Sequence, residues 1–164
     1  MFQKLRTDLV KKLAGIRLVL VNADGFGDGR ENGNGSLPDG KYISALKENG
    51  VEFVAFSKSK SPAASSVAEA LGIELREGVA EALGLYDALK SEFGLADKDI
   101  AFISGDESDI LLIARAGFSA AQPEASLHVK SRSYFVTYHS GGPAVGEIAS
   151  LIYVAKKHPD GWSE

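Results

Sequence analysis

The sequence predicts an α/β fold, Rossmann-like and doubly wound, in which a mostly parallel sheet of about five or six strands carries helices on both faces. Two observations predict it. Residues Ile16–Val21 form a near-continuous apolar run with one Arg, the composition of a strand that is covered on both faces. Strand-like and helix-like segments then alternate along the chain. Because 164 residues is the usual size of one domain, we expect residues 1–164 to form a single domain.

The first half of the chain carries clear helix and strand signals. A helix is expected over 3–14, because apolar residues recur at helical spacing and Gly15 stands where a helix end favours glycine. The strand 16–21 leads into a loop over 22–40, whose length is typical of a functional segment. The elements expected next are a helix over 40–48, a strand over 51–56, a helix over 62–71 and a short strand over 73–75.

The second half continues the alternation. A helix is expected over 79–93, with one apolar stripe formed by Val79, Leu83, Tyr86, Leu89 and Phe93. The remaining elements are a strand over 100–103, a helix over 108–116, a strand over 117–120, a helical turn within 123–131, a strand over 134–138 and a helix over 144–157. The last helix is expected to direct Val145, Ile148, Ile152 and Val154 inward.

Composition excludes several classes of function. The net charge is −4, so the chain lacks the basic surface typical of nucleic-acid binding. There is no Cys, which excludes disulfides and thiolate metal sites. No apolar run approaches the length of a membrane span, and the N-terminus has no secretory h-region. We therefore expect a cytoplasmic protein that binds neither nucleic acid nor membranes.

Three predicted strands end in polar turns, over Asn22–Gly29, Ser57–Ser61 and Ser104–Asp109. The carboxyl ends of parallel strands lie at one edge of a sheet, and ligands bind there in open α/β folds. A hydroxyl, backbone N–H groups and several carboxylates are expected to converge at this edge. Such a set suits a phosphate and a hard cation such as Mg²⁺.

The same turns carry a family resemblance that spans about residues 2–157. NADGFGDG aligns with the motif D-x-D-G-x-x-T-D-G, and DIAFISGDESDILLIARAGFSAA aligns with V-A-Y-I-G-D-D-x-N-D followed by G-x-S-x-A. PDGKYISALKENGVEFVAFSKSKSP and YFVTYHSGGPAVGEI align with two further motifs of the same family. The chain thus resembles the haloacid dehalogenase superfamily of phosphatases. Within it, the chain resembles the capless branch that contains 3-deoxy-D-manno-octulosonate 8-phosphate phosphatase and the C-terminal domain of acylneuraminate cytidylyltransferase.

The resemblance implies a mechanism and a set of roles. In this family an Asp ending the first strand attacks phosphorus, and an Asp two residues later acts as general acid and base. Those positions fall here on Asn22 and Asp24. The phosphate-binding hydroxyl falls on Ser57, and Lys58 is a candidate for a replacement positive charge. The family's charge-compensating Lys falls on Ala82, and an Arg near the substrate becomes Pro143.

The implied metal site is also altered. The ungapped alignment places Gly105 on the main metal carboxylate and Asp106 and Asp109 on the later positions. A shift of one residue would instead make Asp106 the ligand, close to Asp109. Asp24, Asp106 and Asp109 are therefore the candidate ligands for Mg²⁺, whose binding is expected to be weak or absent.

Structural alternatives remain for each candidate. Asn22 could be a harmless residue in a phosphatase that uses another nucleophile. Asp24 could cap its own loop, and Ser57 could cap the following helix. Asp109 is favoured near a helix start without any metal. The three histidines, His128, His139 and His158, show no ligand spacing.

Two principal functions follow from the residues and the resemblance. The first is a phosphatase-like homologue that is catalytically impaired or inactive and serves as a scaffold or ligand-binding protein. The alternative is an active Mg²⁺-dependent phosphatase of small sugar phosphates, with Asp24 or Asp28 as nucleophile. A third, a phospho-ligand binding module, would use Ser57. The resemblance also implies a homo-oligomer, although the tetramer-forming hairpin of the family is shortened here to Glu31–Leu37.

Overall fold

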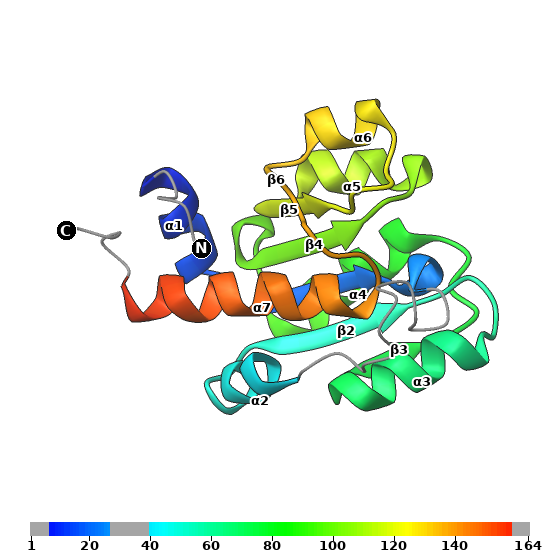
Figure 1. Ribbon diagram of the computed structural model, residues 1–164, viewed down its shortest axis with the longest axis horizontal. Coiled ribbons are helices and arrows are strands. Elements are labelled where there is room, and N and C mark those ends of the chain that lie inside the picture. The colour runs from blue at the N-terminus through cyan, green and yellow to red at the C-terminus, as the bar shows by residue number, and fades with distance from the viewer. Residues whose placement is uncertain (1–6, 27–39, 159–164) are drawn as a thin grey trace.

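A computed structural model describes residues 7–26 and 40–158 of the chain. Its centre is a six-stranded parallel sheet in the order β3-β2-β1-β4-β5-β6 (Figure 1). The strand order reverses between β1 and β4, so a ligand site is expected at their carboxyl ends. The strands are β1 (Leu18–Asn22), β2 (Glu52–Phe56), β3 (Glu74–Arg76), β4 (Ile100–Ser104), β5 (Phe118–Ala121) and β6 (Phe135–Val136).

Helices cover both faces of this sheet, which confirms the predicted fold class. The α-helices are α1 (Thr7–Ala14), α2 (Lys41–Glu48), α3 (Pro62–Leu71), α4 (Ala82–Phe93), α5 (Ile110–Arg115), α6 (Leu127–Arg132) and α7 (Gly142–Lys157). Short 3-10 turns are η1 (Ala23–Gly25), η2 (Asp97–Asp99) and η3 (Glu107–Asp109). Among the helices of the described ranges, none is long and apolar enough to cross a membrane.

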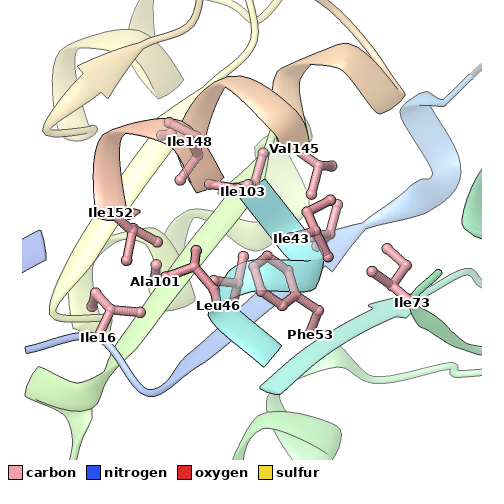
Figure 2. Close-up of a cluster of buried hydrophobic side chains, with 14 of the residues drawn as sticks. Ile16, Ile43, Leu46, Phe53, Ile73, Ala101, Ile103, Val145, Ile148 and Ile152 are labelled. Carbon is pink, nitrogen blue, oxygen red and sulfur yellow. The ribbon is translucent and has the colours of Figure 1, made fainter. Parts of the chain in front are cut away.

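Alternate residues of the central strands face opposite sides of the sheet, and this divides the core into two clusters. On one face, Val19 and Val21 of β1 pack with side chains of α1, α2, α3 and α7. On the other, Leu18 and Leu20 pack with side chains of α4, α5 and α6. Figure 2 shows part of the first cluster, in which Ile148 of α7 belongs to the same group as side chains of β4 and α2. Strands β1 and β4 are apolar up to their last residues, Asn22 and Ser104.

The observed elements differ from the predicted ones at particular places. Helix α4 begins at Ala82, three residues later than predicted. Leu83 is 41% exposed, so the prediction that it lies on an inward-facing apolar stripe is wrong. Leu83 lines a surface hollow, whereas its neighbours Ala82 and Leu85 pack against the core. In α7, Val154 is only partly buried, because the small residues Ala144, Ala149 and Ala155 occupy inward positions.

Two further elements are shorter than predicted. The strand expected over 134–138 contains only β6, because the backbone N–H of Tyr138 donates to the Glu147 carboxylate instead of extending the ladder. The helix expected over 108–116 divides into η3 and α5. Residues 3–6 of the first predicted helix, and Asp28 and Glu31–Leu37 in the loop after β1, lie outside the described residues.

Candidate active site

The site lies where β1 and β4 end, at the reversal of strand order. Both strands are buried along their whole length, and each ends in its first polar residue, Asn22 and Ser104. The parallel ladder pairs Val21 with Ile103, so these two polar residues stand directly beyond that pair. The fold therefore brings two short polar side chains together at the edge that binds ligands in such sheets.

Asn22 is 3% exposed, and both ends of its side-chain amide are hydrogen-bonded. Its Oδ1 accepts from the backbone N–H of Asp24 at 2.9 Å, which caps η1. Its Nδ2 donates to Oδ2 of Asp109 at 2.7 Å, across 87 positions of sequence. The residue at the nucleophile position is therefore fixed as a hydrogen-bond donor to a carboxylate.

Asp109 is 5% exposed and takes a second hydrogen bond on the same oxygen. The Ser104 hydroxyl donates to Oδ2 of Asp109 at 2.7 Å and accepts from the backbone N–H of Asp106 at 3.0 Å. The sequence did not single out Ser104. The signal for it was present, because Ser104 follows the apolar run of β4 as Asn22 follows that of β1.

The pKa values of the two carboxyls in this turn, Asp109 and Asp106, are shifted in opposite directions. Burial raises the pKa of Asp109 above its ordinary value, although hydrogen bonds from Asn22 and Ser104 act the other way. The backbone N–H of Ser108 lowers the pKa of Asp106 below its ordinary value. The Lys58 ammonium also lowers both pKa values to a smaller extent. Lys58 therefore contributes positive potential at these two carboxyls.

The remaining predicted residues lie around the end of β2. The Asp24 side chain is exposed, and its Oδ1 accepts from the backbone N–H of Lys58 at 3.2 Å. Ser57 is fully buried, and its hydroxyl donates to the carbonyl of Ser59 at 2.9 Å. Ser57 is not the cap of α3, because the Ser61 hydroxyl accepts from the first turn of that helix. The Ser57 hydroxyl thus supports its own turn.

An open cleft of about 440 Å³ lies beside Asn22. Its lining includes four carboxylates, and among the described residues that line it there is no Lys or Arg. Glu107 pairs with His128, with 2.6 Å between Oε2 and Nδ1, and the buried Gln122 accepts from the backbone N–H of Gly141. The lining residues are Asn22, Asp24, Gly105, Asp106, Glu107, Gln122, Glu124 and Ala125. Gln122 and Glu124 had no sequence signal, because they follow β5 without a recognisable motif.

A second hollow of about 270 Å³ lies on the other side of Asp109. Its wall includes Lys58, Ala82 and the exposed side chains of Leu83 and Leu111. Ala82, the first residue of α4, thus shares a cavity with Asp109, where the resemblance places a charge-compensating Lys. Pro143 lies in the first turn of α7.

The candidate metal ligands are not gathered into one three-ligand group in the part of the chain that the structure describes. Within residues 7–26 and 40–158 there is no group of three His, Cys, Asp or Glu side chains placed to hold a metal ion. The candidates Asp24, Asp106 and Asp109 therefore form no such group. Oδ2 of Asp109 is occupied by two donors, and Gly105 offers no side chain at all.

Comparison with known proteins places this geometry in a family. No family model matches the sequence. The chain is 26% identical to the 3-deoxy-D-manno-octulosonate 8-phosphate phosphatase of Yersinia pestis, over 94% of this chain and 88% of that protein. It is 30% identical to a probable YrbI family phosphatase from Pseudomonas syringae, which covers 92% of each chain with a TM-score of 0.78.

A further crystal structure shares the fold. The 3-deoxy-D-manno-octulosonate 8-phosphate phosphatase of Moraxella catarrhalis is 23% identical, with a TM-score of 0.77 over 94% of this chain and 95% of that one. That structure is a complex with magnesium ion, phosphate ion and KDO. The motifs at the ends of β1, β2 and β4, the parallel sheet and these relatives agree. The chain belongs to the haloacid dehalogenase superfamily, in the branch of the 3-deoxy-D-manno-octulosonate 8-phosphate phosphatases.

Proposed function

We propose that this chain is a member of the phosphatase family that does not hydrolyse phosphomonoesters and acts as a scaffold or ligand-binding homologue. The observation that carries the proposal is the hydrogen bond from Nδ2 of Asn22 to the Asp109 carboxylate. A covalent phosphoryl step needs an ionised carboxylate at that place, and a neutral amide is a very poor nucleophile. An amide held at both ends cannot present an oxygen to phosphorus without breaking these bonds.

The surroundings of Asn22 support the same conclusion. The cleft is lined by Asp24, Asp106, Glu107 and Glu124, whose charges repel a phosphate dianion unless a cation intervenes. Ala82 supplies no charge to offset them, and the exposed Lys58 is the cation that acts on Asp106 and Asp109. Groups that catalyse as a unit lose most of their effect when one member is gone. Joint loss at positions 22, 82 and 105 fits an inactive site with little or no affinity for Mg²⁺.

A phosphatase assay tests this proposal directly. The full chain is incubated with p-nitrophenyl phosphate and with a keto-sugar phosphate in the presence of Mg²⁺, beside the variant Asp24→Ala. We expect phosphate release by the wild type to equal that of Asp24→Ala. Mg²⁺-dependent release that Asp24→Ala abolishes would overturn the proposal.

One observation favours the alternative of an active phosphatase of small sugar phosphates. Asp24 is exposed beside the cleft and its Oδ1 is oriented by the backbone of Lys58, so a free carboxylate does face the site. In that case Asp24, or Asp28 in the loop, would be the nucleophile. Beryllofluoride forms adducts with such aspartates, and its ¹⁹F NMR signal distinguishes bound from free probe. A bound signal that Asp24→Ala or Asp28→Ala removes would establish this alternative.

The scaffold role also implies self-association. The exposed apolar side chains include Leu111 on α5, Leu127 on α6 and Tyr138 after β6. We expect a homo-oligomer whose contacts differ from those of the family's tetramer, because the hairpin segment is shortened. Light scattering of the full chain in solution checks this, and a monomeric mass across the accessible concentration range would contradict it.

A further inference from the structure

The hydrogen bonds to the Asp109 carboxylate explain how a buried acidic side chain is stabilised in the folded protein. Its buried Oδ2 is shared by two neutral donors, Nδ2 of Asn22 and the hydroxyl of Ser104, each at 2.7 Å. A buried carboxylate requires either a cation or a sufficient set of donors. Here the donors come from the two strand ends on either side of the reversal in strand order, β1 and β4.

An aspartate at position 22 would change this balance. Its side chain would be nearly isosteric with Asn22, but it would direct a carboxylate oxygen rather than an N–H group at Asp109. Two ionised carboxylates at that distance repel each other strongly in a buried site, and one must bind a proton or share a cation. The amide removes the repulsion and supplies a donor at the same place.

We propose that the Asn22–Asp109–Ser104 cluster takes the structural place of a divalent cation at this site. The cluster joins the ends of β1 and β4 by hydrogen bonds and extends through Ser104 to the backbone N–H of Asp106. The fold of this chain is therefore independent of metal, and Asp109 is occupied within the protein. This inference rests on the same residues as the proposed function, but it concerns stability and metal linkage rather than turnover.

Thermal unfolding of the full chain, in EDTA and in excess Mg²⁺, tests the cluster. The wild type is expected to have the same Tm in both buffers. Asn22→Asp is expected to lower Tm in EDTA by about 5 °C or more, because it adds a charge without a partner, and Mg²⁺ is expected to recover part of that loss. A wild-type Tm that rises in Mg²⁺ as much as that of Asn22→Asp would overturn the proposal.

A swapped pair provides the matched control. In Asn22→Asp combined with Asp109→Asn, the amide and the carboxylate exchange positions and the net charge is unchanged. The bond between the two positions is kept with its direction reversed, while the Ser104 hydroxyl loses its acceptor on residue 109. The Tm of this double variant in EDTA is expected to exceed that of Asn22→Asp and to show no response to Mg²⁺. If the swapped pair is no more stable than Asn22→Asp, charge pairing within the cluster is not the cause and the proposal fails.

The neutral variant Asn22→Ala keeps the test decisive if Asn22→Asp does not fold. It removes the donor without adding charge, so we expect an equal loss of Tm in both buffers. An Asn22→Ala variant whose Tm in EDTA equals that of the wild type would show that the amide donor is not needed, which contradicts the cluster's role. If the wild type hydrolyses a phosphomonoester but has the same Tm in EDTA and in Mg²⁺, the proposed function fails. The inference that the cluster takes the place of a cation is then still supported.

Discussion

At the scale of single residues, one contact determines the chemistry of the site. Asn22 donates to Asp109, and Ser104 donates to the same oxygen. The sequence identified Asn22 and Asp109 as candidates, because each occupies a recognisable motif. It could not predict their bond, since the two residues are 87 positions apart and meet only when β1 and β4 pair. Ser104 was missed for a different reason, because a serine after a strand has many structural uses.

The Ser104 hydroxyl is expected to contribute measurably to stability. Ser104→Ala leaves the buried Asp109 with one donor and the Asp106 N–H without this acceptor, so we expect a loss of about 1–3 kcal/mol in the free energy of unfolding. Urea unfolding followed by circular dichroism measures it. The control Ser66→Ala, at an exposed position of α3, is expected to change stability by no more than about 0.5 kcal/mol. Equal effects of the two substitutions would contradict the role given to Ser104.

The raised pKa of Asp109 predicts a pH dependence. Because the folded-state pKa lies above the ordinary value of 3.8, the folded protein binds this proton more tightly than the unfolded chain. Its contribution to stability is therefore full below pH 3.8 and is lost as the pH rises through the raised pKa. Asp109→Asn should remove this contribution. In urea titrations at increasing pH above 3.8, wild-type stability is expected to fall relative to Asp109→Asn, and parallel curves would contradict the assignment.

At the scale of elements, local signals predicted well and non-local ones did not. Helix α3 was predicted with its observed bounds, because Ser61, Pro62 and Gly72 mark its ends within the sequence itself. Strand β6 was predicted too long, because its end depends on Glu147, which lies in another element and accepts from the backbone N–H of Tyr138. The start of α4 was predicted three residues too early, because its N-cap residue Glu81 makes no side-chain cap hydrogen bond of the kind that a sequence signals.

The junction between η2 and β5 offers a test of packing between elements. Gly117 lies so close to η2 that an added Cβ would stand 2.7 Å from the Cα and the carbonyl oxygen of Lys98. Gly117→Ala must displace this backbone, so we expect a loss of about 1–3 kcal/mol in urea unfolding. The control Gly84→Ala, in α4 with open space around it, is expected to be neutral or to stabilise by up to about 1 kcal/mol. A neutral Gly117→Ala would contradict the packing.

At the scale of the whole molecule, the fold of the phosphatase family is retained, and the proposed function adds that the reactive groups are replaced. The parallel sheet and the helices on both of its faces agree with the prediction from the alternation of strand-like and helix-like segments, whereas the strand order was not predicted. The sheet still brings the ends of β1, β2 and β4 to one edge. The family resemblance places a nucleophile, a charge-compensating Lys and, in the ungapped alignment, a metal carboxylate at the positions that Asn22, Ala82 and Gly105 occupy.

The measurement that tests this account most directly is Mg²⁺-dependent phosphate release from a keto-sugar phosphate. It compares the wild type with the triple variant Asn22→Asp, Ala82→Lys and Gly105→Asp, both as full chains. We expect the wild type to remain at the background rate and the triple variant to release phosphate above it, because the variant restores all three replaced groups. Release by the wild type at or above the rate of the triple variant would contradict the account.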